Sequence, residues 1–115
     1  MSVLGNHDYA VYQDCDESQK QRNNKHTIQS ERKMGWTLLL NENRIIRRDS
    51  DSIVIAGMEN WGKMKRMPRR GDVKKSLTGI SDSAFVVMLQ HDPTCWREKI
   101  LPGCKAQLTL SGHTH

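Results

Sequence analysis

The sequence predicts one α/β domain over residues 1–115, with a mixed β-sheet sandwich flanked by helices. Two observations predict this class. Short apolar runs of strand length recur along the chain, several of them rich in β-branched residues, and polar stretches of helical or irregular character separate them. The strand-length runs are Val3–Leu4, Thr37–Leu40, Ile45–Ile46, Ile53–Ala56, Phe85–Leu89 and Leu108–Leu110.

Three polar segments predict helices. A long stretch without proline predicts a surface helix over Glu17–Met34, with Gly35 placed to end it. Two shorter helices are predicted at residues 73–77, after Asp72 as N-cap, and at residues 93–101, before Pro102 and Gly103.

The segment 36–57 predicts that the sheet is mixed rather than purely parallel. It contains two or three short apolar runs joined by tight turns at Asn41–Asn43 and Asp49–Asp51. Strands joined in this way pair antiparallel, whereas the runs near 85 and 108 are separated by a helical segment.

The net charge of +5 comes largely from one basic cluster in the middle of the chain. A solvated basic loop is the ordinary interpretation, and the alternative is a non-enzymatic module that binds nucleic acid or an anionic surface. Only Trp61 lies close by as a stacking platform, so we expect no specific nucleic-acid binding. The cluster consists of Lys63, Lys65, Arg66, Arg69, Arg70, Lys74 and Lys75.

The three cysteines argue against a disulfide framework and against a cysteine zinc site, because their number is odd and no CxxC spacing occurs. No stretch approaches the roughly 20 apolar residues of a membrane span. We therefore expect a cytoplasmic chain, with an upstream membrane anchor left open and the oligomeric state undetermined.

Four of the five histidines directly follow apolar runs: His7 in "GNHD", His91 in "QHDP", and His113 and His115 in "SGHTH". Ligands of α/β sheets gather outside the carboxyl ends of strands, so these imidazoles can meet at one metal site. Zinc, iron or nickel suits such ligands, and manganese is acceptable with added oxygen ligands. Each motif alone also has an ordinary interpretation, as a surface histidine or a turn. We expect His26, in the polar helix, to be exposed.

The order of these motifs resembles the calcineurin-like metallophosphoesterase family, whose signature contains GNH[DE], a later isolated histidine and GHxH. The resemblance extends over the whole chain and is nearest to bacterial metallophosphoesterases. It implies hydrolysis of phosphate mono- or diesters by two divalent metal ions, manganese, zinc or iron. It further implies Asn6, His91 and His113 as ligands of one ion, His115 as a ligand of the other, His7 as the catalytic residue over the phosphate, and Asp8 as its support.

The sequence departs from the family pattern before Gly5. The family motifs DxH and GDxxD, which supply the remaining ligands of the first ion and the bridging aspartate, have no counterpart in the four residues there. We therefore expect a partial metallophosphoesterase domain that holds at most one metal ion and is inactive or weakly active. A one-metal structural site is a further alternative. Some apolar surface should stay exposed, since the strands that follow GHxH in the family are also missing.

Overall fold

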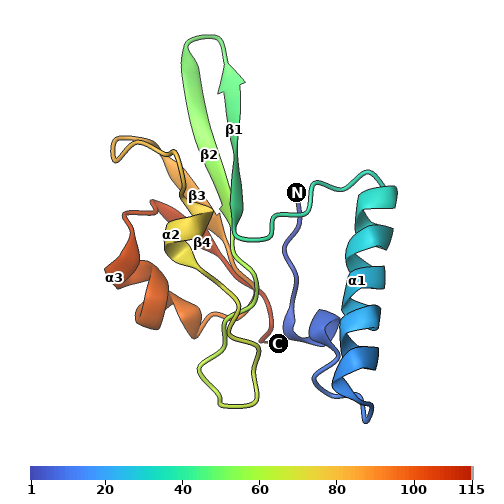
Figure 1. Cartoon of the computed structure of the whole chain (residues 1–115). Coiled ribbons are helices and arrows are strands. Elements are labelled where there is room, and N and C mark those ends of the chain that lie inside the picture. The colour runs from blue at the N-terminus through green and yellow to red at the C-terminus, as the bar shows by residue number, and fades with distance from the viewer. Residues whose placement is uncertain (115) are drawn as a thin grey trace.

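The computed structural model describes residues 1–114 and forms one mixed four-stranded sheet with helices on both sides (Figure 1). This confirms the predicted α/β class. The elements are the 3-10 helix η1 (Asn6–Tyr9), α1 (Glu17–Lys33), β1 (Glu42–Arg48), β2 (Asp51–Gly57), α2 (Val73–Ser76), β3 (Val86–Leu89), the π-helix η2 (Trp96–Ile100), α3 (Leu101–Gly103) and β4 (Leu108–Leu110).

The strand order β1-β2-β3-β4 combines a hairpin with two parallel strands. β1 and β2 pair antiparallel, and Arg48 lies opposite Asp51, so the connecting turn falls where the sequence predicts one. β3 pairs parallel to β2, and β4 pairs parallel to β3. Gly57, Leu89 and Leu110 are level in this register. The residues that follow β2, β3 and β4 therefore leave the sheet at the same edge.

The predicted strands at Val3–Leu4 and Thr37–Leu40 do not form. These runs meet in a single parallel bridge between Ser2 and Leu38, beside the sheet rather than in it. Leu4, Leu38 and Leu39 are buried all the same, and the first two pack with Tyr9 in a small cluster. The second layer of the predicted sandwich thus consists of this bridge and α1, which lie on the opposite side of the sheet from α2 and α3 (Figure 1).

The main hydrophobic core lies on one face of the sheet. Val54 and Ala56 of β2 alternate with residues of the opposite face, as do Val86 and Met88 of β3, and these four pack against α2 and η2. Cys95 is fully buried there, and burial raises the pKa of its thiol to about 12.

The other face of the sheet is covered only at the edge where β2 ends. There Leu39 and Val3 approach Gly57 so closely that a Cβ at Gly57 would lie 2.4 Å from Leu39 Cβ. Further along the same face, large apolar side chains are exposed, as the sequence led us to expect: Ile46, Ile53, Leu108 and Leu110.

Capping residues at both ends explain where α1 begins and ends. Its N-cap Asp16 accepts a hydrogen bond from the Gln19 amide at 2.7 Å. At the other end Gly35, at φ +83°, allows its own amide and that of Trp36 to bond back to Arg32 and Glu31 in a Schellman motif. Gly35 therefore ends the helix, as predicted.

The prediction for residues 93–101 was wrong at both ends. The helical segment η2 begins at Trp96, and α3 continues through Pro102 to Gly103. Proline has no amide hydrogen to donate, so a regular α-helix cannot continue unchanged through Pro102. The wide π-turn of η2 lies immediately before this position.

Asn41 anchors the loop at residues 58–72 to the start of β1. Its buried side chain accepts hydrogen bonds from the amides of Glu59 (3.1 Å) and Asp72 (2.9 Å). The same side chain donates to the Glu59 carboxylate (2.9 Å) and the Arg70 carbonyl (3.0 Å). Its φ of 54° lies in the left-handed region, which asparagine tolerates better than most residues.

Asn41→Ala should lower the free energy of unfolding by at least about 2 kcal/mol. The substitution leaves buried backbone groups without hydrogen-bond partners and places alanine at a positive φ. Urea denaturation followed by circular dichroism measures the change. Gln21→Ala, at an exposed position of α1, is the control and should shift stability by less than about 0.5 kcal/mol. Equal effects of the two substitutions would contradict the role of Asn41.

Candidate metal site

Two histidines lie at the sheet edge where β3 and β4 end. His91 follows β3 by two residues and His113 follows β4 by three. The amide of Gly112 donates to the His91 carbonyl at 3.0 Å, which extends the strand pairing beyond the ladder. His113 then adopts φ 69°, so the chain turns sharply at this residue.

Asn6 reaches the same edge from η1. The Asp8 carboxylate accepts from the Gly5 amide at 2.8 Å and caps this short helix. The Asn6 side chain is fully buried, and its amide nitrogen donates to the Tyr12 hydroxyl at 3.1 Å. Tyr12 thereby fixes the orientation of the amide and turns its oxygen towards the histidines.

Three potential ligand atoms converge at this point. Asn6 Oδ1 lies 3.0 Å from His91 Nε2 and 3.0 Å from His113 Nδ1, and the two nitrogens are 3.2 Å apart. Ligands that hold one ion at about 2.0–2.1 Å are themselves separated by about 3.0–3.4 Å. The three atoms therefore already have the spacing of neighbouring ligands around one ion.

The charge state of His91 suits ligation. Burial lowers the pKa of His91, and the nearby His113 lowers it further because two imidazolium charges would repel each other. His91 is thus neutral at pH 7, the form in which an imidazole binds metal.

The sequence did not single out Asp92, which the structure places behind His113. One oxygen of this buried carboxylate accepts from the amide (2.9 Å) and hydroxyl (2.7 Å) of Thr94. The other oxygen lies 3.9 Å from His113 Nε2, on the far side of the ring from Asn6. A carboxylate in this position favours the tautomer that leaves Nδ1 free to bind metal. The sequence signal that could have identified Asp92 is its position directly after His91.

His7 and Asp8 form no hydrogen bond with the three ligand atoms, although both lie near enough to His91 to influence its pKa. His7 is exposed, and its ring packs on Tyr12 at 4.7 Å between centroids. Asp8 serves to cap η1. His115 lies outside the described residues. Within residues 1–114, no group of three or more His, Cys, Asp and Glu side chains could hold a metal ion, so Asn6 is needed to complete the set.

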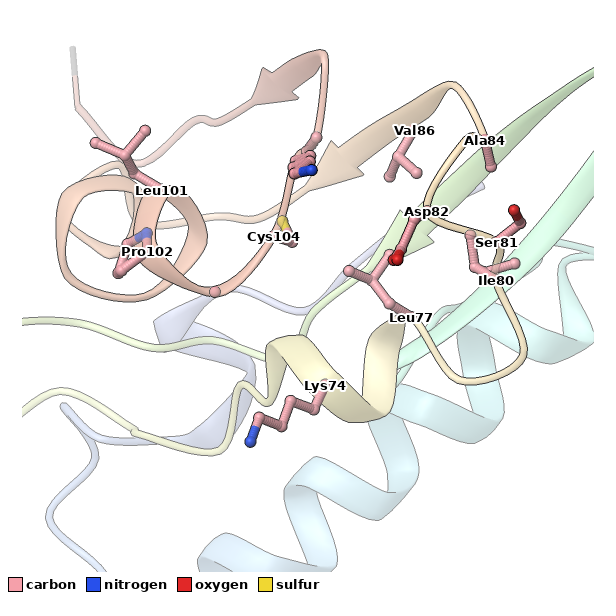
Figure 2. A pocket seen from close by; sticks show the side chains of 13 residues that line it. Lys74, Leu77, Ile80, Ser81, Asp82, Ala84, Val86, Leu101, Pro102 and Cys104 are labelled. Carbon is pink, nitrogen blue, oxygen red and sulfur yellow. The ribbon is translucent and has the colours of Figure 1, made fainter.

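A cavity of about 580 Å³ lies elsewhere, between α2, α3 and the loop before β3 (Figure 2). Leu77, Ile80 and Cys104 line it together with Lys74. It contains none of the predicted site residues, so the candidate metal site is defined by converging side chains rather than by this cavity.

The chain is similar to one curated protein, a zebrafish (Danio rerio) protein named "Transmembrane protein with metallophosphoesterase domain". The two are 34% identical over 70 residues, which cover 59% of this chain and 16% of the zebrafish protein. This chain therefore spans only a small part of that relative. No family model and no solved structure matches the chain.

None of the helices in residues 1–114 has the length and apolarity to cross a membrane.

Two glycines beside His91 provide a test of the site's packing. A Cβ at Gly5 would lie 2.9 Å from the His91 ring, whereas one at Gly112 would come no nearer than 3.8 Å. Gly5→Ala should displace the His91 ring and lower the free energy of unfolding by about 1–3 kcal/mol. Thermal unfolding and the imidazole NMR signals of His91 measure both effects. Gly112→Ala is the control; if it perturbs His91 as strongly as Gly5→Ala does, the described packing is incorrect.

Proposed function

We propose that this chain forms part of a metallophosphoesterase domain, a domain that hydrolyses a phosphate mono- or diester with divalent metal ions, and that the chain itself holds one such ion and is at most weakly active. The convergence of Asn6 Oδ1, His91 Nε2 and His113 Nδ1 at separations of 3.0–3.2 Å carries the proposal. The printed name of the zebrafish relative and the order of the three histidine motifs support it.

The three side chains fit a manganese, zinc or iron ion, because they offer two imidazoles and one amide oxygen. In the parent family His115 would hold a second ion, which this chain is not expected to bind. A bound ion would supply the positive charge that activates a water molecule and neutralises charge on the phosphate.

Of the other residues, some orient the ligand side chains and one transfers a proton. Tyr12 orients the Asn6 amide, and Asp92 orients the His113 ring. His7 is exposed beside Tyr12, where its imidazole can reach a bound phosphoester and protonate the leaving oxygen. Asp8 keeps His7 in place by capping η1.

Metal uptake tests the ligand set. The chain should bind manganese or zinc stoichiometrically in isothermal titration calorimetry at pH 7.5. His91→Ala and His113→Ala should each weaken binding at least tenfold, while His26→Ala, which removes an exposed helical histidine, should leave it unchanged. Affinity should fall as the pH drops through the pKa of His91, which lies below the ordinary histidine value, since a proton then competes with the metal for this imidazole. Unchanged uptake in both site variants would contradict the proposal.

Hydrolysis tests the chemistry. With manganese, an aryl phosphate or an aryl phosphodiester should be cleaved faster than in EDTA, and His7→Ala should lower that rate about 10²-fold. The same variant should leave metal affinity unchanged. If the chain binds metal but shows no metal-dependent hydrolysis, the one-metal structural site replaces the catalytic proposal.

A further inference from the structure

A second cavity, of about 280 Å³, lies beside η1 and is rich in cations. Lys20 of α1 lines it together with Arg66 and Arg70 of the 58–72 loop. Glu17 is the acidic residue in its wall, and Tyr9 is the buried aromatic residue. Three cations therefore face this cavity against one carboxylate.

The residues of the basic cluster differ in the contacts that their side chains make. Lys63 pairs with Glu98 at 2.9 Å. Arg69 donates to the carbonyls of Gly62 (3.1 Å) and Lys63 (2.6 Å), and so closes the loop on itself. By contrast, within residues 1–114 neither guanidinium of Arg66 and Arg70 forms an ion pair or a hydrogen bond.

Aromatic rings hold these two free guanidinium groups in place. The Arg70 group lies 4.9 Å from the centre of the Tyr9 ring, and the Arg66 group lies 5.8 Å from the centre of the Tyr12 ring. Stacking leaves the N–H groups of an arginine available, and their planar fork matches the oxygens of a phosphate or carboxylate.

Lys20 adds a third cation that is not fully neutralised. Its ammonium is 3.6 Å from Glu17, whose side chain is 83% exposed, and an exposed pair of this kind is weak. Lys20 itself is only 24% exposed, so part of its hydration is already lost. An anion in the cavity can therefore be bound by all three cations.

We propose that this cavity, named here the anion pocket, binds a compact oxyanion, and that in a substrate this oxyanion is a second phosphate or carboxylate group. Arg66 links the pocket to the candidate metal site, because the hydroxyl of the Tyr12 ring beneath it accepts the hydrogen bond from the Asn6 amide. The preferred substrate is then a phosphoester with a second anionic group. This assignment to the substrate rests on the proposed function, whereas binding of the oxyanion does not.

Phosphate binding to the metal-free chain tests the pocket. In EDTA, inorganic phosphate should shift the side-chain NMR signals of Arg66 and Arg70, and Arg66→Gln or Arg70→Gln should weaken its affinity at least about fivefold. Arg48→Gln, an equal charge change on the exposed hairpin, is the matched control and should alter affinity less than twofold. Equal loss in all three variants would show attraction by net charge only and overturn the pocket. Because no metal is present, the result is independent of the proposed function.

A second measurement tests the link to the substrate. The metal-loaded chain should bind an alkyl phosphonate with a terminal carboxylate at least about fivefold more tightly than the same phosphonate without it. Arg66→Gln should remove this difference, because the terminal carboxylate then loses its partner in the pocket. Equal affinities in the unaltered chain would contradict the assignment of the pocket to the substrate, and stronger retention of DNA or anionic vesicles than of either phosphonate would favour the basic-module alternative.

Discussion

The buried amide of Asn41 is the constraint on which the arrangement of the candidate site depends. Its four hydrogen bonds fix the 58–72 loop against β1 and orient Glu59. The Glu59 carboxylate in turn accepts from the Tyr9 hydroxyl at 3.0 Å, and burial together with that carboxylate raises the Tyr9 pKa, so the hydroxyl remains a donor. Tyr9 belongs to η1, the helix that carries Asn6. The N-terminal segment forms no sheet ladder, and this chain of polar contacts holds it in place.

The candidate metal site is then a meeting of three segments that are far apart in sequence. The parallel register of β3 and β4 brings His91 and His113 to one edge, and η1 brings Asn6. Two of the three ligands also have a partner behind them, Tyr12 for Asn6 and Asp92 for His113. Such partners reduce the number of orientations that a ligand must lose on binding, which favours a preformed site.

The 58–72 loop connects this site to the anion pocket. One part of it packs against the site, since a Cβ at Gly62 would lie 2.6 Å from Asp92 Oδ2, and another part presents Arg66 and Arg70 to the pocket. A solvated basic loop was the ordinary interpretation of this sequence. In the structure all seven cations are exposed. Lys63 and Arg69 have partners within the protein, whereas Arg66 and Arg70 line a cavity, a distinction that composition does not contain.

The sequence by itself determined the features that depend on neighbouring residues. The N-cap and C-cap chemistry defines α1, alternation and turn residues define the β1 to β2 hairpin, and the position of His91 and His113 after apolar runs predicts that both lie at a strand end. Only the tertiary structure decided that residues 3–4 and 37–40 stay outside the sheet, that Tyr12 and Asp92 support the ligands, and that Arg66 and Arg70 share a pocket. The physical reason is that these outcomes depend on hydrogen bonds and packing between distant segments, such as the contact of Asn6 with His113 across 107 positions, for which no local pattern exists.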